Sequence, residues 1–187
     1  MVDKNYCLMG KDIEEILITE DQIRQRIREM GQQIKQDYMD KDLLTVCILR
    51  GAVMFYCDLV KEIDLPLTMN FMAVSRYGNA SQSSGMVRIQ YDLQQNIQGK
   101  DVLIVEDIVD SGHTLTHLTK LLSSRNPKSL KVCTLLDKPE RREVPFEADY
   151  VGFEVPDKFV VGYGLDYAEK YRTYKHIGIL KPHIYTD

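Results

Sequence analysis

The stretch that decides the fold is VLIVEDIVDSGHT, residues 102–114. It starts as an unbroken apolar run, which is typical of a strand covered on both faces. Three carboxylates follow, Glu106, Asp107 and Asp110, and residues 111–114 then open a helix. Ligands of open parallel sheets bind beyond the carboxyl ends of the strands. We therefore expect this acidic loop to lie in a binding site.

The start of the expected helix suits a phosphate group. Its free backbone N–H groups and hydroxyls come from Ser111, Gly112, His113 and Thr114, and glycine lets several N–H groups converge on one anion. Carboxylates are unexpected beside a site for a negatively charged phosphate. A ribose diol or a Mg²⁺ ion between the carboxylates and the phosphate would explain them. The alternative is a solvated strand end with Asp110 as a helix cap.

Strand and helix patterns alternate along the chain, which predicts an α/β fold with a largely parallel sheet. Thr19 to Gln22 forms a capping box at the first helix. The N-terminal 18 residues and the segment after Gly164 are expected to pack as a cap beside the sheet. The expected strands are 14–18, 44–49, 67–74, 87–93, 101–105, 130–136, 150–153 and 159–161, and the expected helices are 19–38, 52–63 and 114–122.

Length and composition exclude several classes of protein. The chain has 187 residues, which suits one domain, and its 24 basic and 28 acidic residues give a net charge of −4. That charge lacks the basic excess of a general nucleic-acid binder. Apolar runs are far shorter than the ~18 residues of a membrane span. The N-terminus has no signal pattern, which favours a cytoplasmic location, and four cysteines without a C-x-x-C pair favour reduced thiols.

The acidic stretch resembles the phosphoribosyl pyrophosphate (PRPP) motif of the type I phosphoribosyltransferases, in the form found in their 6-oxopurine branch, the hypoxanthine phosphoribosyltransferases. Four further blocks and one arginine resemble family segments in the family's order and cover nearly the whole chain. They are the pyrophosphate loop at 49–51, the start of the lid at 75–78, the purine-reading lysine block at 136–138, the base-stacking segment at 156–167, and Arg172.

The resemblance implies a single phosphoribosyltransferase domain over residues 1–187, with a small hood formed by the chain ends and a flexible lid at about residues 75–86. Ser75, Arg76 and Tyr77 would open that lid. The implied reaction belongs to purine salvage. It transfers the 5-phosphoribosyl group of PRPP to N9 of hypoxanthine or guanine, depends on Mg²⁺ and releases pyrophosphate. The family also implies a homodimer or homotetramer.

The resemblance also implies a role for each matched residue. Glu106 and Asp107 would hold the ribose hydroxyls and act on the metal, and Asp110 would manage the proton of purine N7. Residues 111–114 would bind the 5′-phosphate. Pyrophosphate would lie on Arg50, Gly51 and Arg172, although the family more often has lysine at the position of Arg50, and the peptide before that position is often cis. The purine would meet Lys138, Phe159, Val160 and Asp166, and Asp166 would also hold a second metal.

Other interpretations of the sequence were weighed. A transcriptional regulator on the same fold is one, but such proteins usually lose the Asp110 carboxylate and have a basic face. Transferases for adenine or orotate are another, but their motifs commonly begin with two aspartates. The His113–His117 spacing suits zinc, yet it has no evident third ligand. The basic cluster at 138–142 is expected to be an ordinary loop.

Overall fold

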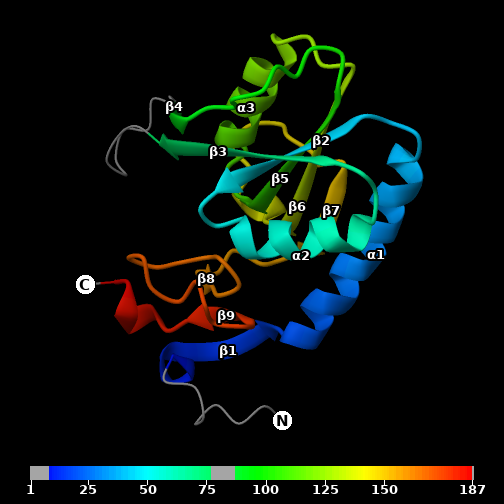
Figure 1. Ribbon diagram of the computed structural model, residues 1–187. Coiled ribbons are helices and arrows are strands. Elements are labelled where there is room, and N and C mark those ends of the chain that lie inside the picture. Colours follow the sequence, from blue (N-terminus) through cyan, green and yellow to red (C-terminus); the bar gives the residue numbers. More distant parts are fainter. Residues whose placement is uncertain (1–8, 77–86, 187) are drawn as a thin grey trace.

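The computed structural model describes residues 9–76 and 87–186. A six-stranded sheet has the order β4-β3-β2-β5-β6-β7, and all its strands except β4 are parallel to their neighbours. The predicted α/β fold with a largely parallel sheet is confirmed (Figure 1). The strands are β2 (Leu43–Leu49), β3 (Thr68–Arg76), β4 (Val87–Tyr91), β5 (Asp101–Val109), β6 (Ser129–Asp137) and β7 (Tyr150–Glu154).

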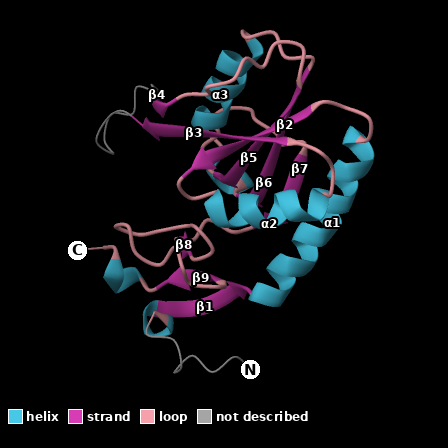
Figure 2. Ribbon diagram, viewed as in Figure 1, coloured by secondary structure: helices cyan, strands magenta, loops and turns pink. Residues whose placement is uncertain are grey.

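Helices cover both faces of this sheet. On one face lie α1 (Glu20–Tyr38) and α2 (Val53–Ile63), and on the other lies α3 (His113–Ser123), as Figure 2 shows. Alternate residues of one strand enter different cores, because successive side chains of a strand point to opposite faces. In β5, Leu103 and Val105 pack on the α1 side, and Val102 and Ile104 pack on the α3 side.

A second, three-stranded antiparallel sheet forms the expected hood. Its order is β1-β9-β8, so strands from opposite ends of the described chain lie side by side below the main sheet (Figure 1). The residues are Ile13–Ile18 for β1, Val160–Val161 for β8 and Ile177–Leu180 for β9. The prediction that 159–161 continues the strand series of the main sheet is wrong, because β8 pairs with β9 in the hood. Short apolar segments do not show which sheet receives them.

The capping box at the start of α1 is confirmed. Thr19 Oγ1 accepts a hydrogen bond from the Gln22 backbone N–H at 3.3 Å, and Thr19 N–H donates to Gln22 Oε1 at 2.9 Å. Since β1 ends one residue earlier, at Ile18, this cap marks the point where the chain leaves the hood and begins to cover the main sheet.

Two expected boundaries need correction. β5 runs on to Val109 because β6 continues to pair with it, so Glu106 and Asp107 lie in a strand rather than in a loop. β3 likewise includes Ser75 and Arg76, which pair with β4, so the segment expected as a lid does not begin at Ser75. The rest of that expected segment, with Tyr77, lies outside the described residues.

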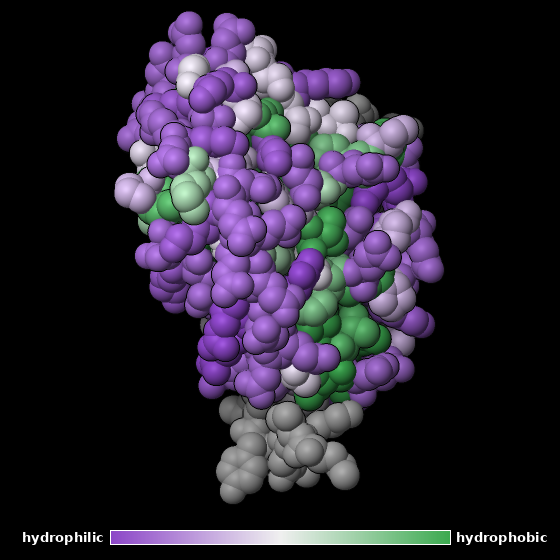
Figure 3. All heavy atoms as spheres, turned by 90° about the vertical axis from the view of Figure 1, so that its right-hand side faces the viewer, coloured by the Kyte–Doolittle hydropathy of each residue, from purple (hydrophilic) through white to green (hydrophobic). Residues whose placement is uncertain are grey.

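The face shown in Figure 3 is mainly hydrophilic and is crossed by one band of hydrophobic residues. Within the described part of the chain, no helix combines the length and apolar character needed to span a membrane. Among the described residues, Cys47 and Cys133 are buried in the core, Cys57 is exposed, and all three are free thiols, whereas Cys7 lies outside the described residues.

Candidate active site

A cavity of about 420 Å³ lies at the carboxyl ends of β2 and β5, where the main sheet meets the hood. It is lined by four separate parts of the chain. Three of them follow or end β2, β3 and β5, which meet because parallel strands end at one edge of a sheet, and the fourth belongs to the hood. The residues from the predicted site that line it are Arg50, Gly51, Ser75, Glu106, Asp107, Asp110, Gly112, Thr114, Asp166 and Arg172.

Two carboxylates project from the end of β5. Glu106 is 8% exposed, and its Oε1 accepts a hydrogen bond from the Asp107 backbone N–H at 3.2 Å. Asp107 Oδ1 accepts from the Ile108 backbone N–H at 2.8 Å. Burial nevertheless raises the pKa of the Asp107 carboxyl, because its charged form loses hydration. The strand end therefore holds acceptors that suit hydroxyl groups or a cation.

Two glycines allow the segments around the cavity to approach closely. A Cβ on Gly51 would lie 1.6 Å from Asp107 Oδ2, so only glycine fits there without displacing that carboxylate. Gly164 has φ +104°, and a Cβ on it would lie 1.9 Å from the Gly51 carbonyl oxygen. The peptide between Leu49 and Arg50 is cis, as the family resemblance predicts. The turn after β2 is thus pressed between β5 and the hood.

Arginines and carboxylates form a network on the hood side of the cavity. Arg172 Nη2 lies 2.8 Å from Asp166 Oδ1 and 3.4 Å from Glu169 Oε2. Arg172 Nη1 also donates to the Gly164 carbonyl at 2.7 Å. Arg50 Nη2 pairs with Glu169 Oε1 at 2.9 Å. One carboxylate, Glu169, therefore bridges the two arginines that were predicted to bind pyrophosphate.

Sequence reasoning did not single out Glu169. Its signal was its position three residues before Arg172, in the block next to the predicted metal ligand Asp166. That spacing alone describes a solvated surface residue equally well. The link to Arg50, 119 residues away, exists only in the folded chain.

The turn into α3 has the geometry expected of an anion-binding helix start. Gly112 is the N-terminal cap with φ +89°, a conformation that glycine adopts without strain. Gly112 and Thr114 line the cavity, whereas Ser111 and His113 are not among its lining residues. Ser111 is 4% exposed, and His113 Nε2 lies 3.0 Å from Glu143 Oε2. Backbone N–H groups at this turn remain suitable for a phosphate.

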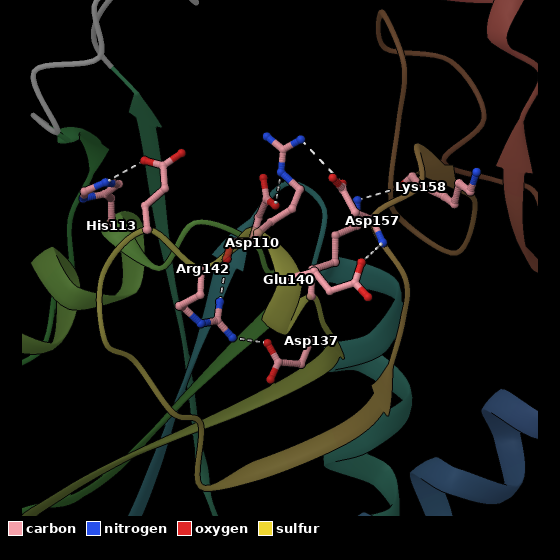
Figure 4. Close-up of polar contacts among 10 residues, drawn as sticks. Asp110, His113, Asp137, Glu140, Arg142, Asp157 and Lys158 are labelled. Atoms are coloured by element: carbon pink, nitrogen blue, oxygen red, sulfur yellow. Dashed lines mark hydrogen bonds and ion pairs between the residues drawn. The ribbon is translucent and has the colours of Figure 1, made fainter.

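The basic cluster at 138–142 is not the ordinary loop that we expected. It forms a 3₁₀ turn over Pro139–Arg141 that folds back over Asp110 (Figure 4). Arg141 Nε lies 3.0 Å from Asp110 Oδ1, and Arg142 Nη1 donates to the Asp110 carbonyl at 2.5 Å. Arg142 also pairs with Asp137. The expectation failed because β5 and β6 are adjacent, so the segments that follow them meet.

Of the residues predicted to meet the purine, Asp166 lines the main cavity, whereas Lys138, Phe159 and Val160 do not. Lys138 is 8% exposed, and its Nζ donates to the Lys158 carbonyl at 2.5 Å. Burial lowers the pKa of its ammonium group. Phe159 is partly exposed and stacks on Tyr185 with the ring centroids 4.7 Å apart. Val160 is buried in β8. Tyr185 was not predicted.

The donor atoms of the cavity fit a hard divalent cation. Glu106, Asp107 and Asp166 contribute carboxylate oxygens to one cavity. Among the described residues, no group of three or more histidines, cysteines or carboxylates forms a preassembled metal site. Mg²⁺ is commonly held by one or two carboxylates together with substrate phosphates, so a full protein cage is not required.

The geometry is that of a parallel-sheet protein whose cavity at the strand ends is lined by carboxylates, arginines and a helix start. Comparison with known proteins gives its class. A family model described as the phosphoribosyl transferase domain matches residues 14–168. The chain belongs to this family.

Within the family, the chain is similar to hypoxanthine-guanine phosphoribosyltransferases. It is 51% identical to the one from Bacillus subtilis, over 95% of this chain and 99% of that protein. It is 52% identical to the one from Mycobacterium tuberculosis, over 93% of this chain and 89% of that protein. It is also 54% identical to the bifunctional protein TilS/HprT of Listeria innocua, of which it spans 28%.

Solved structures agree with this placement. A hypoxanthine phosphoribosyltransferase from Staphylococcus aureus superimposes with a TM-score of 0.94 at 49% identity, covering 97% of this chain and 98% of that one. A hypoxanthine phosphoribosyltransferase from Trypanosoma cruzi gives 0.89 at 43% identity, covering 94% and 95%. The similarity therefore includes the hood as well as the main sheet.

Proposed function

We propose that this chain is a purine-salvage enzyme. It transfers the 5-phosphoribosyl group of PRPP to N9 of hypoxanthine or guanine and releases pyrophosphate. The products are the corresponding nucleoside monophosphates. The observation that carries the proposal is the single cavity that joins the carboxylates of β5, the start of α3 and the arginine network of the hood. These groups match the diol, the phosphate and the pyrophosphate of PRPP.

The sugar part of the reaction is assigned to β5 and α3. The broken bond is at an anomeric carbon, so positive charge develops on the ribose in the transition state. Glu106 and Asp107 accept hydrogen bonds from the ribose hydroxyls and stabilise that charge. Residues 111–114 hold the 5′-phosphate through backbone N–H groups, and Gly112 and Thr114 of this segment line the cavity.

The leaving group is assigned to the loop after β2 and to the hood. Arg50, Gly51 and Arg172 bind pyrophosphate, the arginines by charge and the loop by its backbone N–H groups. Both arginines already hold the Glu169 carboxylate. Pyrophosphate carries more negative charge than one carboxylate and takes its place between them.

The base is assigned to residues that directly follow β5 and β6 and to residues at the start of β8. Asp110 accepts the proton of purine N7, which becomes acidic as N9 attacks. Lys138 donates to the 6-oxo group, Phe159 stacks on the ring, and Val160 offers backbone groups to its edge. Asp166 closes the pocket on the hood side.

Mg²⁺ is assigned to Glu106, Asp107 and Asp166, where it would neutralise the charge of the bound phosphates. The protein would contribute the carboxylate oxygens of these three residues as metal ligands beside the bound phosphates.

The direct test is product formation. Purified chain, PRPP and Mg²⁺ are incubated with hypoxanthine, guanine, xanthine or adenine, and nucleotides are separated by chromatography. We expect monophosphates from hypoxanthine and guanine. No product from any purine, together with RNA binding in a gel-shift assay, would instead favour the regulator that shares this fold.

The expected setting of the enzyme belongs to the same proposal. It acts on small molecules in the cytoplasm as a homodimer or homotetramer, without nucleic-acid or membrane partners. Light scattering coupled to gel filtration measures the mass directly. A mass near 21.7 kDa, that of one chain, would contradict the oligomer.

A further inference from the structure

The contacts around Asp110 involve a residue that the proposed mechanism does not use. Asp110 Oδ1 is buried and makes no hydrogen bond within the described residues; Arg141 Nε lies 3.0 Å from it as an ion pair. A buried carboxylate oxygen is costly without a cation or a donor beside it. Among the residues that the structure describes, Arg141 supplies the ion pair that the Asp110 carboxylate makes. Arg142 holds the same residue by its backbone carbonyl, so it does not orient the carboxylate.

The same guanidinium reaches the segment that was assigned to the base. Arg141 Nη1 lies 3.5 Å from Asp157 Oδ1, and the Asp157 backbone N–H donates to Glu140 Oε2 at 3.4 Å. Asp157 stands two residues before Phe159. Figure 4 shows Asp110, Asp137 and Asp157 arranged around this turn. One guanidinium therefore makes an ion pair with both carboxylates and links Asp110 to Asp157.

We infer that Arg141 is a positioning residue for the proposed transfer: it orients the Asp110 carboxylate through Oδ1 and ties it to the purine-binding segment at Asp157. The inference rests on the proposed function. A proton acceptor works only within hydrogen-bond reach of its proton, and small displacements of such groups reduce turnover strongly. Arg141 therefore acts through Asp110 and not on the substrate.

The first test is the Arg141→Gln chain. The Arg141 side chain is 47% exposed, so we expect the variant to fold. Turnover with hypoxanthine should fall about tenfold to a hundredfold, while the KM for PRPP stays within about twofold of the parent. Arg141→Lys keeps the cation without the planar fork and should recover part of the loss. The matched control is Arg125→Gln, which breaks an arginine–aspartate ion pair of 2.7 Å outside the cavity and should leave turnover unchanged.

The second test is a double-mutant cycle with Asp110→Asn. If Arg141 acts through the Asp110 carboxylate, Arg141→Gln should change turnover by less than about twofold in the Asp110→Asn background. Two losses that multiply would show an independent structural role and overturn the inference.

The parent chain is assayed first, which keeps the two proposals distinguishable. An inactive parent overturns the proposed function and this inference with it. An active parent with an equally active Arg141→Gln variant overturns the inference alone.

Discussion

Asp110 is held at two atoms by the two arginines that follow β6. The residue lines the cavity, and its neighbours in the chain form the start of α3. This arrangement suits a group that must stay in place while a proton moves. The Arg142 contact is to the backbone carbonyl of Asp110, so it survives a change of the Asp110 side chain. The Arg141 contact is to the carboxylate and does not.

We expect Asp110→Asn to keep the fold and the affinity for PRPP while lowering turnover about 10²-fold or more, the usual scale for acid–base groups. The amide is nearly the same size as the carboxylate but does not accept the N7 proton. PRPP binding by calorimetry and product formation by chromatography measure the two effects separately. Turnover within about twofold of the parent would remove Asp110 from the mechanism.

We predict that Lys138 sets the choice of base. Its ammonium is a donor without acceptor capacity, so it suits the 6-oxo group and opposes the 6-amino group of adenine. A required polar partner of this kind can discriminate by about 10⁴-fold. We expect good activity with hypoxanthine and guanine, negligible activity with adenine, and a large loss of oxopurine activity in Lys138→Ala. Adenine turnover within about tenfold of hypoxanthine would show that Lys138 does not read the base.

Burial of Lys138 also predicts a dependence on pH. Because burial lowers the pKa of its ammonium, the positive charge is lost at a lower pH than in an exposed lysine. Raising the pH removes that proton, so kcat/KM for hypoxanthine should fall on the alkaline side. Lys138→Gln is the control. Ionisation of the purine lowers kcat/KM in the parent and in the variant alike, but the part of the alkaline fall that is caused by Lys138 should be absent from the variant. Identical alkaline profiles would contradict the assignment.

At the scale of elements, the end of β5 and the turn after β2 act as one unit. β5 continues past the point where its apolar run stops, because β6 offers pairing partners as far as Asp137. That extension carries Asp107 to within contact of Gly51. Gly51 therefore leaves room for the Asp107 carboxylate and also forms the turn after β2.

We expect Gly51→Ala to impair activity more than stability. The added Cβ would lie 1.6 Å from Asp107 Oδ2, the end of a side chain, so relief comes by displacing that carboxylate. Turnover should fall about tenfold or more, with a change in unfolding free energy of about 1 kcal/mol or less. Enzyme assays and urea titration measure the two.

Gly99→Ala is the converse control. Gly99 has φ +73°, and a Cβ added there would meet nothing within 4 Å, so alanine strains the backbone without touching the cavity. It should cost about 1 kcal/mol and leave turnover unchanged. Equal losses of turnover in both variants would mean that the effect of Gly51→Ala is not local to Asp107.

At the scale of the whole molecule, the hood and the main sheet share one core. Ile18, Val160 and Ile177 of the hood belong to the same buried cluster as Phe55 and Leu59 of α2. Arg172 and Gly164 then join the hood to the cavity wall. The cavity between the two sheets therefore depends on their docking.

This shared core predicts that the chain unfolds as one unit. Ile177 is fully buried, so Ile177→Ala should cost about 2–5 kcal/mol. Far-UV circular dichroism and the near-UV tyrosine signal should report one coincident urea transition in parent and variant. Met39→Ala, at a side chain that is 54% exposed, is the matched control with little expected effect. Two separate transitions would contradict the proposal of a single domain.

The sequence by itself determined the parts that depend on near neighbours in the chain. The apolar runs of β2, β5 and β6 indicate buried strands, and Thr19 and Gln22 form a cap within four residues. The motif at 102–114 predicts a strand, carboxylates and an anion-binding helix start in that order. Those features need only local periodicity and local hydrogen bonds.

Only the tertiary structure decided what lies opposite each of these segments. The extension of β5 depends on its pairing with β6, and the contact of Glu169 with Arg50 joins residues 119 positions apart. From the sequence, the segment around Arg141 is predicted to be a solvated loop. In the structure it lies over Asp110, because β5 and β6 are adjacent and end together. These contacts depend on which strands become neighbours. That choice is made by the free energy of pairing and burial over the whole sheet, which no single segment of the sequence determines.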